Sequence, residues 1–165
     1  MKGVLVVKIK TVLKNEFTVI GKIGQGLSKD ASDWVPRIWE GANKDFDQIK
    51  TIILYNNDGG IKGLWGIMSD VQEKFEVWNE NGKYLAGCEA DKNAIPPEGW
   101  TKWTIPAQTY LSVACSNETY GDIFNYIKTD YIIKNNLKIA GAIHEHYPEP
   151  GNPNNIELYF PVKKR

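Results

Sequence analysis

Two stretches decide the fold: Gly63-Leu-Trp-Gly-Ile-Met-Ser-Asp70 and Lys138-Ile-Ala-Gly-Ala-Ile-His-Glu145. They can be laid on each other without a gap, which places Asp70 opposite Glu145. Each stretch follows a predicted helix and belongs to a run of predicted strands. The order strand, helix, strands therefore occurs twice along the chain, and such a repeat predicts an internal duplication.

Apolar periodicity predicts the elements around these two stretches. Runs rich in Val, Ile and aromatic residues predict strands at residues 4–10, 17–23, 63–68, 75–78, 83–90, 109–115, 138–147 and 156–162. Apolar residues at steps of three and four predict one helix over residues 28–50, with Pro36 in its first turn. A second helix is expected to begin at residues 117–119, with Tyr120 and Phe124 on its apolar face. Residues 24–26 and 56–60 are expected to be loops, and residues 80–82 the turn of a hairpin.

This order predicts an α+β fold made of two pseudo-symmetric βαββ units with antiparallel sheets, two main helices and a central cleft. We expect a single domain over residues 1–165, with halves at approximately 1–95 and 96–165. Clefts at the junction of two such units are common ligand sites.

Composition narrows the classes of function. The 165 residues include 20 Lys+Arg and 20 Asp+Glu. This balance argues against direct nucleic-acid binding, which usually needs a basic face. No stretch has the length of a membrane span, and the N-terminal residues lack the pattern of a signal peptide. The two cysteines, Cys88 and Cys115, provide no disulfide framework. We therefore expect a cytoplasmic protein.

Aromatic residues and one carboxylate point to a binding site. The chain has 6 Trp, 8 Tyr and 5 Phe, and excess Trp and Tyr often line ligand sites. In the strand predicted over residues 138–147, a period of two places Glu145 on the apolar face. A buried carboxylate needs compensation, which a cation stacked between aromatic rings would supply. The pattern alone leaves open that Glu145 is exposed at a strand end or paired with a lysine.

Other chemistries have weak support. His144 and His146 share the face opposite Glu145, and the chain has no third histidine, so no metal site is expected. Gly24-Gln-Gly26 lacks the remaining glycines of a dinucleotide fingerprint. Neither cysteine has an evident base beside it. We expect no cofactor and assign no catalytic residue.

Several segments resemble the gyrase-inhibitor-like (GyrI-like) family, which includes the effector-binding domains of AraC-type and MerR-type multidrug regulators. They are Gly99-Trp-Thr-Lys-Trp-Thr-Ile-Pro-Ala-Gln-Thr-Tyr110, Tyr84-Leu-Ala-Gly-Cys-Glu89, Ile143-His-Glu-His-Tyr147 and Ile156-Glu-Leu-Tyr-Phe-Pro-Val162. Their order and spacing span most of the chain. The resemblance implies two βαββ units around a ligand cleft, and a related two-module haem-binding (SOUL-like) fold offers haem by analogy only.

The resemblance also implies roles for particular residues. Glu145 matches the ligand-facing acid of the family, and Tyr147 matches an aromatic residue of the same signature. Trp39, Trp65, Trp103 and Tyr110 are further candidates for pocket walls, with ordinary packing as the alternative for each. Two positions depart from the family pattern: His144, where Tyr is frequent, and Gln108, where Gly is frequent.

Three functions follow as hypotheses. The first is a stand-alone module that binds a small apolar or aromatic molecule, neutral or cationic, because no helix-turn-helix precedes the resemblance. The second is a hydrolase of reactive electrophiles, in which Glu145 beside tyrosines would activate water. The third is binding to a protein partner such as gyrase, which is implied by the family name alone. The first hypothesis is favoured.

Overall fold

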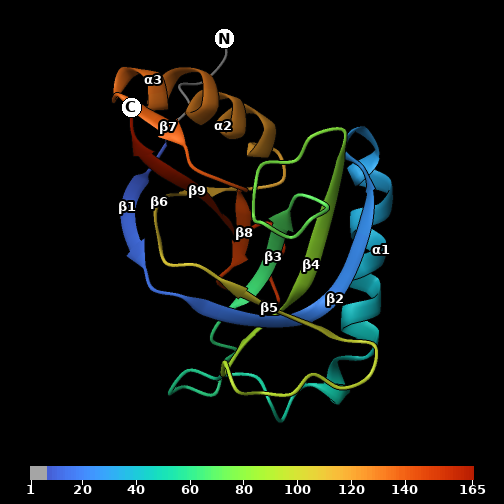
Figure 1. Ribbon diagram of the computed structural model, residues 1–165. Helices are drawn as coiled ribbons and strands as arrows, with labels where there is room; N and C mark the ends of the chain where they lie inside the picture. The colour runs from blue at the N-terminus through green and yellow to red at the C-terminus, as the bar shows by residue number, and fades with distance from the viewer. Residues whose placement is uncertain (1–6) are drawn as a thin grey trace.

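The β-branched and aromatic stretches form antiparallel strands in the computed structural model, which describes residues 7–165 (Figure 1). The strands are β1 (Ile9–Lys14), β2 (Phe17–Leu27), β3 (Leu64–Ser69), β4 (Asn81–Ala90), β5 (Thr101–Ile105), β6 (Gln108–Cys115), β7 (Leu137–Ile139), β8 (His144–Tyr147) and β9 (Ile156–Lys164). The helices are α1 (Ala31–Lys44), α2 (Tyr120–Tyr126) and α3 (Ile132–Lys134), and a π-helical turn (Ile127–Tyr131) joins the last two. Short 3₁₀ turns flank α1 at Ser28–Asp30 and Phe46–Gln48.

The strands form one nine-stranded sheet in the order β1-β6-β9-β8-β3-β4-β2-β5, and β7 pairs with β9. Its inner six strands comprise three from each βαββ unit, β2-α1-β3-β4 and β6-α2-β8-β9. The two units meet where β3 pairs with β8, in a register that sets Gly66 opposite Glu145. The α+β class and the two main helices are confirmed, although the strands form one continuous sheet rather than separate sheets.

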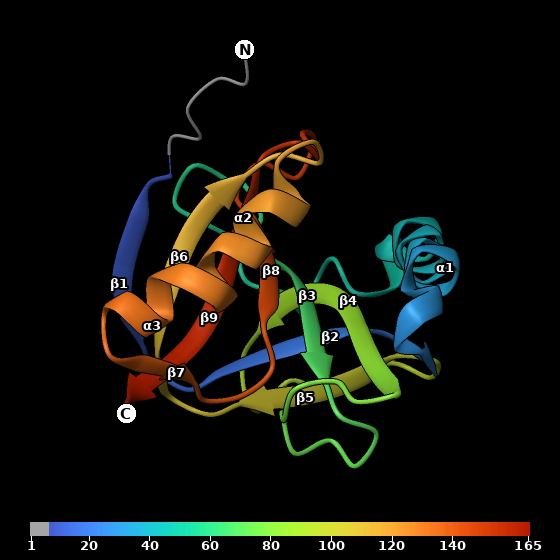
Figure 2. The ribbon, with the colours of Figure 1, turned by 90° about the horizontal axis from the view of Figure 1, so that it is seen from above.

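The helices and the core divide the molecule into layers. The helical segments α1 and α2–α3 lie toward the two ends of the sheet, with β3 and β8 between them (Figure 2). One apolar cluster packs under α1 and a second under α2 and α3. A third cluster, which includes Trp65 and Trp103, packs on the other face of the sheet. Neighbouring residues of a strand therefore belong to different layers.

Two predicted loops are wrong, because long-range pairing takes them into strands. Residues 24–26 continue β2 and pair with residues 82–84 of β4. Asn81 and Gly82, expected in a hairpin turn, begin β4, and residues 75–78 form no strand. The expected hairpin is absent for this reason. Ladder hydrogen bonds to a distant strand outweighed the local turn preference of these glycines.

The strand predicted over residues 138–147 is also interrupted. It divides into β7 and β8, and between them the backbone N–H of Ala140 donates to Pro161 and that of Ala142 donates to Phe75. Helix α1 ends at Lys44 rather than near residue 50, and Pro36 is its sixth residue rather than part of the first turn. Of the strand predicted over residues 4–10, residues 4–6 lie outside the described residues. The strand found there begins at Ile9 and runs to Lys14.

Candidate ligand-binding site

Glu145 lies on β8 where the two βαββ units meet, and the residue is only 8 % exposed. Three tyrosine hydroxyls donate hydrogen bonds to its carboxylate. Tyr84 reaches Oε1 at 2.5 Å, Tyr120 reaches Oε2 at 2.6 Å, and Tyr147 is more distant, 3.5 Å from Oε1. Within residues 7–165, no ion pair involves Glu145. The carboxylate is therefore held by neutral donors alone.

Gly66 makes room for this network. It lies directly across from Glu145 in the β3–β8 ladder and beside Ala86 of β4. A Cβ atom at this position would come within 1.8 Å of the Tyr84 hydroxyl oxygen and 2.8 Å of Oε1 of Glu145. The hydrogen bond between tyrosine and carboxylate requires glycine here, because any side chain would occupy the same space.

The carboxylate opens into a pocket of about 640 Å³ between α1, α2 and the sheet. The pocket is lined by Ala31, Ser32, Val35, Pro36, Met68, Trp78, Tyr84, Asn117, Tyr120, Gly121, Phe124, Asn125 and Glu145. Most of these side chains are apolar or aromatic. The walls come from both helices, from β3 and β4, and from the loop that precedes β4. A largely apolar pocket of this size with one charged group has the character of a small-molecule site.

Burial controls the protonation of the groups around Glu145. Desolvation raises the pKa of Glu145, and the hydrogen bonds from Tyr120, Tyr84 and Tyr147 oppose that rise without cancelling it. Burial also raises the pKa of the Tyr84 and Tyr120 hydroxyls, and the nearby carboxylate raises it further. The tyrosines therefore remain neutral donors. A cation placed in the pocket would stabilise the ionised carboxylate and lower its pKa.

Trp39 and Tyr147, both expected at the site, contact the hydrogen-bond network of Glu145 but do not line the main pocket. The indole N–H of Trp39 donates to the Tyr84 hydroxyl at 2.9 Å, and its ring packs edge-on against Tyr147 with centroids 5.3 Å apart. The two rings also line a smaller pocket of about 230 Å³ together with Pro150 and Pro153. They orient the Glu145 network from outside the main pocket.

The other three aromatic candidates lie on the opposite face of the sheet. Trp65 donates to Glu89 at 2.9 Å and Trp103 donates to Glu73 at 2.9 Å. Tyr110 packs against Tyr159 with ring centroids 5.4 Å apart. None of the three lines the pocket of Glu145. The lining residues are instead spread over elements that are distant in sequence.

Besides the apolar lining residues, sequence reasoning missed Tyr84 and Tyr120, the two tyrosines that make short hydrogen bonds to Glu145. Tyr120 had a signal, because it lies on the predicted apolar face of the second helix at its first turn. Tyr84 lies in a predicted strand, but its contact with Glu145 depends on the pairing of β4 with β3 and of β3 with β8. A single sequence carries no signal for that register.

The histidines are engaged on the opposite face of the sheet from Glu145. Nδ1 of His144 accepts a hydrogen bond from the backbone N–H of Met68 at 3.2 Å, and burial lowers the pKa of this histidine to about 3. His146 lies 2.7 Å from a carboxylate oxygen of Glu157.

In the part of the chain that the structure describes, no three His, Cys, Asp or Glu residues are grouped as a metal site. Over the same residues, no helix has the length and apolar character needed to cross a membrane.

Residues 10–162 match the family model of Cass2, described as an integron-associated effector binding protein. The chain belongs to the Cass2 family. Cass2 is a GyrI-like family, so the resemblance seen in the sequence is confirmed. The match covers both βαββ units and every residue that lines the pocket. A comparison with curated protein sequences gives no significant match.

Solved structures share the fold of this Cass2 family member at low sequence identity. An integron cassette protein from Vibrio cholerae is 15 % identical with a TM-score of 0.63, over 94 % of this chain and 95 % of that one. SAV2435, solved with tetraphenylphosphonium bound, is 13 % identical with a TM-score of 0.69, over 94 % of each chain. The EcmrR C-terminal domain is 14 % identical with a TM-score of 0.66, over 98 % of this chain and 100 % of that one. At these identities the likeness is one of fold.

Proposed function

We propose that the protein binds a small apolar cation in the pocket between α1 and α2, with Glu145 as the counter-charge. One observation carries this proposal: Glu145 is buried at the base of an apolar pocket and receives hydrogen bonds from neutral donors only. Removing a carboxylate from water costs several kcal/mol, and neutral donors offset only part of that cost. A bound cation would supply the missing compensation.

The walls of the pocket suit the same ligand. Trp78, Tyr84, Tyr120 and Phe124 present aromatic rings to the cavity. Each ring that faces a desolvated cation contributes roughly 0.5–2 kcal/mol. The cavity volume of about 640 Å³ accommodates a ligand with several aromatic rings. Apolar walls also favour charge that is spread over a large molecule, because a small hydrated ion would lose its water without replacement.

The comparisons support an effector-binding role. The family description names effector binding, and SAV2435 was solved with a lipophilic cation. A regulatory role follows as part of the proposal: the chain senses the effector, and nucleic acid is contacted elsewhere. EcmrR has also been solved in complex with DNA, and this chain covers 59 % of that EcmrR chain. The balanced charge of this chain agrees with the division of labour proposed here.

The experiment compares a cation with a neutral molecule of similar shape. Tetraphenylphosphonium and triphenylphosphine oxide would be titrated by calorimetry into the wild type, Glu145→Gln and Glu89→Gln. Glu89→Gln is the matched control, because Glu89 is also buried but lies on the other face of the sheet. We expect Glu145→Gln to weaken cation binding at least tenfold, which is about 1.4 kcal/mol, and to change binding of the neutral probe less than threefold.

Two outcomes would count against the proposal. Absence of cation binding to the wild type would remove it altogether. Equal loss of both probes in Glu145→Gln would show that the residue shapes the pocket rather than acting as a counter-charge. Because burial raises the pKa of Glu145, cation binding is also expected to tighten as the pH rises and to release a proton.

A further inference from the structure

Trp78 is a wall of the main pocket, and it stands on a loop without regular secondary structure. The loop joins β3 to β4, and Trp78 lines both the main pocket and a side pocket of about 150 Å³. The two pockets share Met68, Trp78 and Phe124. The position of this indole ring therefore sets where one cavity ends and the next begins.

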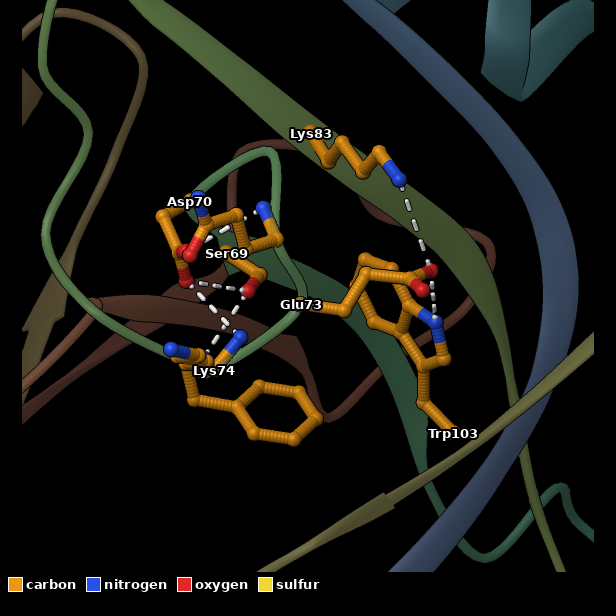
Figure 3. Close-up of polar contacts among 8 residues, drawn as sticks. Ser69, Asp70, Glu73, Lys74, Lys83 and Trp103 are labelled. Atoms are coloured by element: carbon orange, nitrogen blue, oxygen red, sulfur yellow. Dashed lines mark hydrogen bonds and ion pairs between the residues drawn. The ribbon is translucent and has the colours of Figure 1, made fainter.

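Asp70 organises this loop, as Figure 3 shows. Its Oδ1 accepts hydrogen bonds from the backbone N–H groups of Lys74 at 2.9 Å and Glu76 at 3.1 Å, and from the Ser69 hydroxyl at 3.1 Å. Its Oδ2 accepts one from the backbone N–H of Gln72 at 3.2 Å. A single carboxylate thus satisfies three backbone donors of a segment that has no helix or strand to satisfy them. Asp70 was aligned with Glu145 in the sequence, but it faces the loop and not the pocket.

The loop needs such an anchor because its backbone is strained. Glu73 and Phe75 have φ angles of 59° and 58°. This left-handed region costs a residue with a side chain roughly 1 kcal/mol or more. Further contacts hold these two residues: the Ser69 hydroxyl accepts from the backbone N–H of Phe75 at 2.9 Å, and Glu73 accepts from Trp103 and pairs with Lys83 at 3.7 Å.

The folded loop places the Trp78 ring in a packing site formed by Lys83, Trp34 and Gly82. Its indole N–H donates to the backbone oxygen of Lys83 at 3.0 Å, and its ring packs on Trp34 with centroids 5.4 Å apart. The ring also lies against Gly82, where a Cβ atom would come within 2.3 Å of it. Trp78 therefore packs at one defined position on β4. The conformation of residues 70–76 determines whether its side chain can reach that position.

We infer that Asp70 is a positioning residue for the effector pocket, which holds the β3–β4 loop so that Trp78 forms the wall against the bound cation. The inference rests on the proposed function and adds to it a residue that does not touch the ligand. The four hydrogen bonds of the Asp70 carboxylate then determine the shape of the pocket at the wall formed by Trp78. Asp70 has its effect through Trp78.

The test is a double-mutant cycle on tetraphenylphosphonium binding, measured by calorimetry with Asp70→Ala, Trp78→Ala and the double variant. We expect each single variant to bind about tenfold more weakly, and the double variant to bind no more weakly than Trp78→Ala. The fluorescence emission of Trp78 is obtained by subtracting the spectrum of a Trp78→Phe variant from that of its parent. In the Asp70→Ala background this difference spectrum should lie at longer wavelength than in the wild-type background, because the indole ring becomes hydrated. Asp91→Ala is the control, because Asp91 also accepts from a loop backbone N–H, that of Asn93, outside the pocket.

The outcomes separate this inference from the proposed function. Failure of the wild type to bind the cation removes the proposed function first. If the wild type binds, either of two results overturns the positioning role. One is a double variant whose loss of affinity equals the product of the two single losses, and the other is unchanged affinity in folded Asp70→Ala. If Asp70→Ala does not fold, Asp70→Glu keeps the charge but displaces the carboxylate by one methylene group. That variant is expected to show the same loss and the same absence of further loss with Trp78→Ala.

Discussion

Glu145 and Glu89 are two buried carboxylates on opposite faces of one sheet, 8 % and 6 % exposed. Glu89 receives the indole N–H of Trp65 at 2.9 Å and the ammonium group of Lys14 at 3.4 Å, both at Oε1. The same ammonium lies 4.3 Å from the ring centroid of Phe17 and 5.3 Å from that of Trp65. Glu145 has aromatic neighbours and hydroxyl donors but no cationic partner among the described residues.

The difference between the two carboxylates is that Glu145 has no cation from residues 7–165 beside it. On the Glu89 face the chain supplies its own cation, held between a carboxylate and aromatic rings. On the Glu145 face the carboxylate and the rings are present, and the place beside them is an open pocket. Lys14 therefore shows, within the same molecule, the arrangement that we propose for a bound cation. Glu89 also borders a cavity, of about 560 Å³, but Lys14 lines that cavity and already compensates the carboxylate. Glu145 has no such cation among the described residues, and this is the difference on which the proposed function depends.

The largest expected effect comes from filling the glycine beside each carboxylate. Gly66→Ala would bring a Cβ atom within 1.8 Å of Tyr84, whereas Gly63→Ala would bring one 2.6 Å from Trp65 and 2.7 Å from Glu89. We expect Gly66→Ala to destabilise the fold by about 3 kcal/mol and Gly63→Ala by about 1 kcal/mol. Denaturant unfolding of both variants would measure the difference. An equal cost would mean that the sites of Glu145 and Glu89 tolerate an added methyl group equally well, and the two carboxylates would then not differ in how tightly they are enclosed.

Removing the internal cation should have the next largest effect. Lys14→Met keeps the aliphatic stem but leaves Glu89 without a counter-charge. We expect a loss of about 2 kcal/mol in the free energy of unfolding, which is less than for a fully buried pair because the Lys14 side chain is 23 % exposed. Glu89→Gln in the same chain should restore most of the loss. If Lys14→Met is neutral in denaturant unfolding, the ammonium does not compensate the carboxylate.

The smallest effect concerns Glu145 and has the opposite sign. Burial raises the pKa of Glu145 above its ordinary value of 4.5. At a pH between the ordinary pKa and the raised pKa, the folded protein therefore keeps a proton that the unfolded chain has released. Wild-type stability therefore falls as the pH rises through this window, and Glu145→Gln lacks this fall. We expect the variant to match the wild type near pH 4 and to exceed it by about 1 kcal/mol at pH 8, which is roughly 2–4 °C in Tm. Melting curves across this range would test it, and a less stable variant at pH 8 would contradict the uncompensated carboxylate.

Much of the fold could be predicted from local patterns. Apolar alternation located most strands, helical spacing located both main helices, and the repeated order indicated the two βαββ units. The errors arose where pairing between distant segments decided the outcome. Residues 24–26 have the composition of a loop, yet they lie in β2 because β4 pairs with them. Residues 140–143 look like a strand, yet the backbone N–H groups of Ala140 and Ala142 donate to Pro161 and Phe75 outside a regular ladder.

The alternation around Glu145 placed this residue on the apolar face and His144 and His146 on the other, as the structure confirms, but it left the burial of Glu145 open. The tryptophans show the limit of this reasoning. Trp65 and Trp103 are as aromatic as any pocket residue, but the register of their strands places them on the Glu89 face. Tyr84 lies 61 positions before Glu145 and meets it only through two ladders. Composition counts aromatic rings without assigning them to a face.

The sequence by itself determined the class of elements, their order and the strand face on which Glu145 lies, because periods of two and of three to four residues are local properties of the chain. Only the tertiary structure decided which tyrosines meet Glu145, which carboxylate receives Lys14, and where Trp78 stands. Those contacts depend on strand register and on the path of a loop. Both are set by hydrogen bonds between residues far apart in sequence, and neither leaves a periodic trace in the chain.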